Sequence, residues 1–142
     1  MSYLVDTNVI SELVRPKPAP AVVAWFEGVA DEALHLSVLT LGEIERGVAK
    51  LAPSARRRRI EAWLRADLPA RYEGRILPVD GTVAARWGLI SAAAERKGRP
   101  LPAIDSLIGA TALVHRLAVV TRNVADFVPT GVRCVDPWAL RR

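Results

Sequence analysis

Apolar and polar positions follow two different periods along the chain. Short apolar or alternating runs of strand type occur at Tyr3–Val5, 34–38, 76–79, Ala118–Val120 and 132–135. Between them, apolar residues recur at helical spacing and predict helices at 7–15, 22–29, 41–51, 60–68, 81–96 and 102–114. Pro78 cannot donate a ladder hydrogen bond, so the run at 76–79 is predicted to be an edge strand.

This alternation of strands and helices predicts an α/β fold. Helical stretches of about 10–15 residues between strands are typical of a mainly parallel central sheet with helices on both faces. In such sheets the functional crevice lies outside the carboxyl ends of the strands. The residues that directly follow each strand are therefore the ones to examine for chemistry.

The composition fits one ordinary globular domain over residues 1–142. The chain has 142 residues, of which 51% are hydrophobic and 25% charged, too apolar for a disordered chain. No apolar run approaches the roughly 20 residues of a membrane span. Asp6 and Glu12 interrupt any apolar leader, and the single Cys134 excludes a disulfide framework. We expect a cytoplasmic protein that does not bind membranes.

The net charge of +5 is carried almost entirely by arginine, with seventeen arginines against three lysines. The planar guanidinium suits phosphate and carboxylate, so an arginine-rich surface indicates a polyanionic partner or substrate. A genome rich in G and C also favours arginine codons, as it favours the abundant alanine. Composition alone leaves both interpretations open.

Acidic residues cluster after the predicted strands. Asp6 directly follows the first strand, Glu43 lies in the helix after the second, and Asp105 lies in the first turn of the last long helix. Asn123 and Asp126 follow the fourth strand. In a parallel sheet these side chains converge, and their charges repel unless a cation joins them. Without His or Cys pairs at ligand spacing, the oxygen ligands predict Mg²⁺, or Mn²⁺, rather than zinc.

Each acid also has a purely structural interpretation. Asp6 is well placed to be an N-cap, Glu43 can close a capping box that starts at Thr40, and Asp126 can be an ordinary loop acid. Asp105 is harder to explain in this way. It is the only charged residue of the helix predicted at 102–114, and an apolar helix face retains a carboxylate only where something positive meets it.

Four sequence blocks resemble a known family. They are 5–10 (VDTNVI), 41–44 (LGEI), 104–112 (IDSLIGATA) and 121–127 (TRNVADF), and together they span essentially the whole chain. In these blocks and in their order the chain resembles the PIN-domain ribonucleases, and especially the VapC and FitB-like toxins of bacterial type II toxin–antitoxin pairs.

The resemblance implies a PIN-like fold and a Mg²⁺-dependent endoribonuclease. It carries Asp6, Glu43 and Asp105 over as catalytic acids that hold the metal ion. Asp126 is expected to be the fourth such acid with Asn123 as a supporting polar group, although which of the two completes the site stays open.

Further expectations concern substrate and partners. The residues expected to bind RNA or to orient ligands and phosphate are Thr7, Asn8, Thr121, Arg122, Asn123 and Arg99. The resemblance also implies a small cognate antitoxin of the VapB or FitA type, bound over the acidic crevice, and a homodimer.

A run of four arginines, 56–59, opens the helix predicted at 60–68. Such a run is usually a solvated helix start. Cations at a helix N-terminus nevertheless meet the unfavourable end of the helix dipole, so a phosphate contact can explain why they stand there. Both interpretations stay open.

Other phosphate-handling classes fit poorly. A receiver domain needs paired acids after the first strand, a haloacid-type phosphohydrolase needs an acid where Asn8 stands, and a dinucleotide binder needs a glycine-rich turn. The remaining alternative from a different class is a PIN fold without catalysis that binds RNA or a protein partner.

Overall fold

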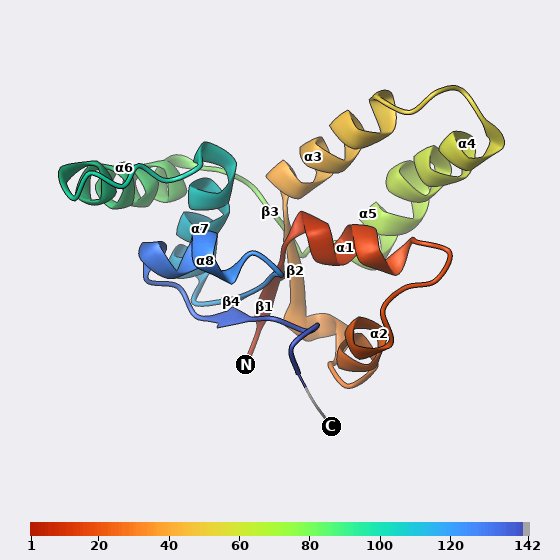
Figure 1. The fold of residues 1–142 in the computed structure, drawn as a ribbon, viewed down its shortest axis with the longest axis horizontal. Helices are drawn as coiled ribbons and strands as arrows, with labels where there is room; N and C mark the ends of the chain where they lie inside the picture. Colours follow the sequence, from red (N-terminus) through yellow and green to blue (C-terminus); the bar gives the residue numbers. More distant parts are fainter. Residues whose placement is uncertain (141–142) are drawn as a thin grey trace.

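The computed structural model describes residues 1–140 and is built around one five-stranded sheet (Figure 1). Its strands are β1 (Tyr3–Val5), β2 (Leu34–Ser37), β3 (Ile76–Leu77), β4 (Ala118–Val120) and β5 (Cys134–Val135). The order is β3-β2-β1-β4-β5, and every pair is parallel. The predicted parallel α/β architecture is confirmed, and β3 lies at the edge, as Pro78 indicated.

Helices connect the strands and account for most of the described residues. They are α1 (Thr7–Leu13), α2 (Pro20–Glu27), α3 (Val38–Ala49), α4 (Ala55–Ala62), α5 (Leu68–Arg71), α6 (Gly81–Arg96), α7 (Ala103–His115) and α8 (Val124–Phe127). A π-helical turn, Trp63–Asp67, joins α4 to α5, and short 3₁₀ turns lie at Asp31–Ala33 and Val128–Thr130. No helix among these residues combines the length and apolar character that crossing a bilayer requires.

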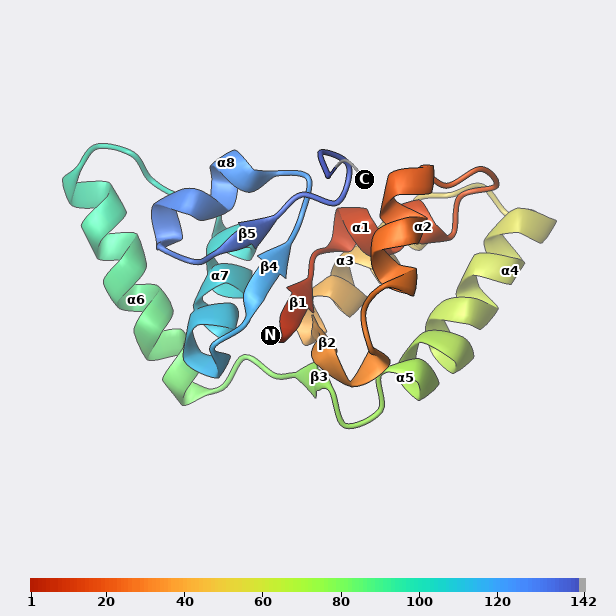
Figure 2. The same ribbon diagram turned by 90° about the horizontal axis from the view of Figure 1, so that it is seen from below.

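Both faces of the sheet are buried, because successive strand residues point to opposite faces and helices pack on each of them. Leu4 and Val119 pack in a cluster with residues of α7 and α8. Their neighbours Val5 and Val120 pack in a second cluster with residues of α1, α2 and α3. Figures 1 and 2 show the same division, with α6, α7 and α8 on one side of the strands and α1 to α5 on the other.

Two predicted helix starts differ from the structure, each for a local reason, although the second was already predicted to be opened by the arginine run 56–59. The strand predicted at 34–38 stops at Ser37, whose Oγ accepts a hydrogen bond from the backbone N–H of Leu39 at 3.0 Å, so α3 already begins at Val38. Thr40 is therefore inside the helix, and Glu43 closes no capping box with it. The helix predicted at 60–68 begins earlier, at Ala55, because Ser54 Oγ caps it through Arg57 N–H at 3.1 Å.

Candidate active site

The strand order reverses between β1 and β4, and the predicted acids gather around this point. β2 and β3 extend the sheet on one side of β1, whereas β4 and β5 extend it on the other. Crevices open at the carboxyl ends of strands where connections diverge in this way. Asp6 follows β1 and Thr121 follows β4, and the Asp6 N–H donates to the Val120 carbonyl at 2.9 Å.

Asp6 is nearly inaccessible, at 3% exposure, and its carboxylate accepts three hydrogen bonds. The donors are the Thr7 N–H at 2.8 Å, the Thr121 hydroxyl at 2.8 Å and the Asn8 side-chain amide at 3.2 Å. Burial raises the pKa of Asp6 more than these donors lower it, and the charge of Glu43 raises the pKa further. Asp6 is thus an N-cap of α1 and also a member of an acidic cluster.

Glu43 is tied to Asp6 through the residue between them. The Thr7 hydroxyl donates a 2.5 Å hydrogen bond to Glu43 Oε1, which links the first turn of α1 to α3. Glu43 lies in the second turn of α3, and its side chain is half-buried. One threonine therefore joins two carboxylates, by its backbone to one and by its side chain to the other.

Asp105 interacts electrostatically with every other predicted acid. It lies in the first turn of α7 and is half-buried. Desolvation, followed by the negative charges of Asp6, Asp126 and Glu43, raises the pKa of Asp105 to about 6. The other three acids predicted from sequence are therefore close enough to Asp105 to raise its pKa.

The donor chemistry of this cluster suits a hard divalent cation. All four acids offer oxygen, and within residues 1–140 none of them forms an ion pair with a basic side chain. In the same part of the chain, no three acidic, His or Cys side chains already stand in the arrangement of a metal site. The acids therefore form an uncompensated electrostatic cluster and not a finished coordination cage.

Asn8 connects the polar residues around the cluster. Its amide nitrogen donates to the Thr121 hydroxyl at 3.3 Å, and its side-chain oxygen accepts from the Arg122 N–H at 3.2 Å. The Asn123 N–H donates to Thr121 Oγ1 at 3.0 Å, although the Asn123 side chain does not cap α8. The loop after β4 is thereby fixed to the start of α1.

Two hollows adjoin Glu43 and Asp126 and hold four of the six predicted substrate-binding residues, whereas Thr121 and Asn123 line neither. Glu43, Thr7, Asn8 and Arg122 line a cleft of about 500 Å³. The other hollow, of about 540 Å³, lies between the loop after α6 and the start of α8, where Arg99 and Asp126 line it. Arg99 thus lies with Asp126 and does not share the cleft of Glu43.

Sequence reasoning missed Trp138. Its ring lies under the guanidinium of Arg122, with 4.9 Å between the guanidinium carbon and the ring centroid, and it lines the same cleft. A tryptophan just after the last strand is as compatible with the core as with a site, so no signal in the sequence distinguished it. The finding shows what holds Arg122 at the edge of the cleft.

A comparison with known protein families identifies the family of this chain. The family model for the PIN domain matches residues 3–127. The chain belongs to the PIN domain family. The resemblance found in the four sequence blocks is therefore confirmed, and this PIN domain places its acid cluster at the carboxyl ends of β1 and β4.

Relatives of this PIN domain cover almost its whole length. The toxin FitB of Neisseria gonorrhoeae is 38% identical over 95% of this chain and 97% of its own. The VapC ribonuclease Y4jK of Sinorhizobium fredii is 33% identical over 95% of this chain and 96% of its own.

Solved structures show the same fold. FitAcB from Neisseria gonorrhoeae superposes with a TM-score of 0.92 at 38% identity, covering 97% of this chain and 99% of that one. DNA-bound VapBC from Salmonella typhimurium superposes with a TM-score of 0.78 at 27% identity, covering 96% of this chain and 98% of that one.

Proposed function

We propose that the protein is a metal-dependent endoribonuclease that acts as the toxin of a type II toxin–antitoxin module. The observation that carries this proposal is the grouping of Asp6, Glu43 and Asp126 around Asp105 in a chain of the PIN domain family. Four interacting carboxylates without a basic partner are suited to a divalent cation. Relatives named as a toxin and as a ribonuclease support the reaction class.

The proposed ligands of Mg²⁺, or of Mn²⁺ in its place, are Asp6, Glu43, Asp105 and Asp126. A bound ion of this kind lowers the pKa of a coordinated water and polarises the phosphate oxygens of the substrate. Because the acids do not already form a cage, we expect the ion to draw the carboxylates together. Asp126 is favoured over Asn123 as the fourth acid because its charge acts on Asp105.

The chain's own residues then orient the acids and the substrate. Thr121 and Asn8 hold the Asp6 carboxylate, and Thr7 orients Glu43, which would bind the ion through a water molecule or steer the attacking water. The residues proposed to bind the RNA backbone are Thr7, Asn8, Thr121, Arg122, Asn123 and Arg99. Arg99 would reach the substrate from the neighbouring hollow that it shares with Asp126.

The partners follow from the relatives. The relative FitB is named a toxin, and the two solved structures are named FitAcB and DNA-bound VapBC. We therefore propose a small VapB- or FitA-like antitoxin that covers the acid cluster, a homodimer of this chain, one domain over residues 1–142 and action on RNA in the cytoplasm.

The nuclease proposal is tested with purified protein and a defined RNA in the presence of Mg²⁺. Cleavage is expected for the wild type and is expected to be lost in Asp6→Asn, in Asp105→Asn and in excess EDTA. The matched control is Glu45→Gln, because Glu45 lies on the same helix as Glu43 but pairs with Arg65 at 2.7 Å on the exposed surface. Equal cleavage by all variants would remove the assignment.

The alternative is a PIN fold that binds RNA or a protein without cutting. The lack of a ready-made metal arrangement within residues 1–140 favours it. A Mn²⁺ titration by calorimetry separates the two. If the wild type binds Mn²⁺ and both Asp6→Asn and Asp105→Asn lose this binding, the result supports the nuclease. If the wild type neither binds Mn²⁺ nor cleaves RNA, the result supports the alternative.

A further inference from the structure

The arginine run 56–59 begins α4, a helix with no buried residue. Ser54 satisfies an N–H at its start, but four positive charges there oppose the helix dipole. Burial of these residues in the core therefore does not explain why four arginines stand at the start of α4. The structure gives the individual arginines different surroundings.

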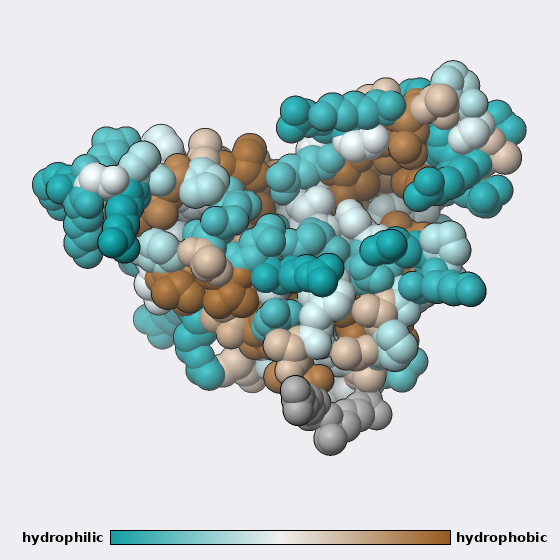
Figure 3. All heavy atoms as spheres, in the orientation of Figure 1, coloured by the Kyte–Doolittle hydropathy of each residue, from teal (hydrophilic) through white to brown (hydrophobic). Residues whose placement is uncertain are grey.

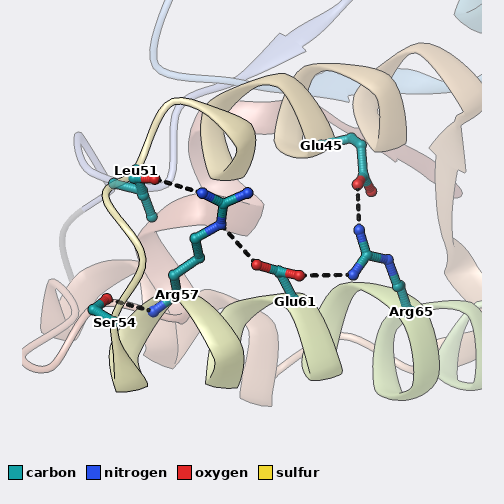
Figure 4. A network of polar contacts seen from close by, with 6 residues as sticks. All are labelled: Glu45, Leu51, Ser54, Arg57, Glu61 and Arg65. Atoms are coloured by element: carbon teal, nitrogen blue, oxygen red, sulfur yellow. Dashed lines mark hydrogen bonds and ion pairs between the residues drawn. The ribbon is translucent and has the colours of Figure 1, made fainter.

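Arg57 is used to hold α4 against α3. Its Nε pairs with Glu61 Oε1 at 2.8 Å, and its Nη1 donates to the Leu51 carbonyl at 2.7 Å (Figure 4). Glu61 also pairs with Arg65 at 2.8 Å, and Arg65 pairs with Glu45 of α3 at 2.7 Å. This network occupies the side chain of Arg57 and joins α4 to α3.

Arg56 lines the cleft that Glu43 and Thr7 line at the acid cluster. Within residues 1–140 neither Arg56 nor Arg122 takes part in an ion pair. The cleft's other arginine, Arg15, pairs with Glu12 at 3.2 Å. Two cations without a carboxylate partner thus share one cleft with the acid site.

The cleft continues along α4. A second hollow of about 460 Å³ shares Arg56 with the first and adds Arg59, over a floor that includes Ile60 and Trp63. Figure 3 shows hydrophobic atoms between the hydrophilic outer surfaces in the part of the molecule formed by α3 and α4. The path from Glu43 is therefore apolar at its base, with Arg56 and Arg59 on its α4 side.

We propose that single-stranded RNA runs from the acid cluster along this cleft, with Arg56 and Arg122 binding backbone phosphates next to the scissile bond and Arg59 binding one further along. The inference rests on the proposed ribonuclease function and assigns its substrate path. Guanidinium groups bind phosphate oxygens through paired, charge-assisted hydrogen bonds. Of the run, Arg56 and Arg59 contact RNA, whereas Arg57 is structural.

Binding is measured with a 5′-fluorescein-labelled, 12-nucleotide single-stranded RNA of mixed sequence, by anisotropy between 50 and 200 mM NaCl. The Asp105→Asn protein is used so that the probe stays intact. Arg56→Gln is compared with Arg58→Gln, which removes the same charge from an exposed position outside both hollows. Each lost phosphate contact lowers the slope of log Kd against log salt by about 0.7.

The expected result is a slope reduced by about 0.7 and binding about fivefold weaker at 100 mM NaCl in Arg56→Gln, with Arg58→Gln close to the parent protein. With Asp105 restored, Arg56→Gln is expected to raise KM and leave kcat within about twofold, because the contact is made equally in the ground and transition states. A melting curve for each variant confirms folding.

Equal effects of Arg56→Gln and Arg58→Gln, or no binding of the RNA probe, would overturn the inference. The cleft would then be a binding site for a protein segment. Its failure is separable from that of the nuclease proposal. If the wild type cuts RNA but Arg56 and Arg58 behave alike, only the RNA path is wrong. If the wild type does not cut but Arg56→Gln weakens salt-dependent binding selectively, only the nuclease proposal is wrong.

Discussion

The Thr7 hydroxyl donates a 2.5 Å hydrogen bond to Glu43 Oε1 across 36 positions of sequence, while the Thr7 N–H binds the Asp6 carboxylate at 2.8 Å. Two acids from different helices are thus oriented through one residue. Since Thr7 touches the carboxylates through separate groups, substitution of its side chain alters Glu43 and leaves the backbone contact to Asp6 in place.

Thr7→Val is expected to reduce kcat for RNA cleavage by about 10- to 100-fold, the usual effect of removing a group that orients a metal-binding side chain. Valine matches threonine in shape but has no donor for Glu43. Thr7→Ser keeps the hydroxyl and is expected to retain most activity. Steady-state cleavage rates of the two variants make the comparison, and similar losses in both would show that the hydroxyl does not matter.

Asp105→Asn is expected to stabilise the metal-free protein at pH 7.5 while abolishing cleavage. The pKa of Asp105 is raised to about 6, so the fold disfavours its charge. The full shift corresponds to about 3 kcal/mol, which solvent at this half-buried side chain reduces to roughly 1–2 kcal/mol. Urea unfolding in EDTA measures the difference. A less stable asparagine variant would show that Asp105 supports the fold.

The same shift fixes the direction of a pH effect. The folded-state pKa of Asp105 lies above its unfolded value near 4, so its unfavourable contribution to stability is present above pH 6 and disappears as the pH falls toward 4. The wild type in EDTA should therefore lose less stability on acidification over this range than Asp105→Asn does. Parallel pH–stability curves would contradict this.

Metal binding is expected to compete with that proton. At pH 5 the Kd for Mn²⁺ should be about tenfold weaker than at pH 7.5, because the carboxyl of Asp105 must lose its proton to bind the ion. Calorimetric titration in buffers of different ionisation enthalpy measures both the Kd and the protons released. A Kd that does not change with pH would exclude Asp105 as a ligand.

Arg57→Gln is expected to affect stability and leave RNA binding nearly unchanged, the reverse of Arg56→Gln. The pair with Glu61 lies at the surface, so the melting temperature should fall by no more than about 2 °C. Thermal unfolding at low and high salt checks this, since screening should shrink the difference. A change in the salt slope for RNA equal to that of Arg56→Gln would show that Arg57 also contacts the ligand.

The strands were predictable because each is a short apolar or alternating run, and Pro78 marked the edge strand. The start of α3 was not, because Ser37 is buried inside an alternating strand pattern and Thr40 offers an equally good cap in sequence. The start of α4 was indicated by the arginine run 56–59 and not by apolar residues. Its first residues carry no apolar periodicity, since the network around Arg57 and not the core holds them.

For the site, positions that follow strands predicted which acids lie near Asp105. The negative charges of Asp6, Asp126 and Glu43 raise the pKa of Asp105, as this proximity requires. Their roles as ligands stay predictions. Sequence could not separate Arg56 from Arg57, because adjacent helical residues point about 100° apart and only the packing of α4 on α3 decides which one faces the cleft. Trp138 was missed because a tryptophan after the last strand fits the core as well as a site.

The hydrogen bond between Thr121 and Asp6 joins residues 115 positions apart, and β4 pairs directly with β1 at the centre of the sheet. During synthesis the first strand emerges long before its neighbour exists. Most of the chain is therefore synthesised before the carboxylates can come together. The acidic centre therefore cannot be completed around Asp6 until β4 and Thr121 have been synthesised.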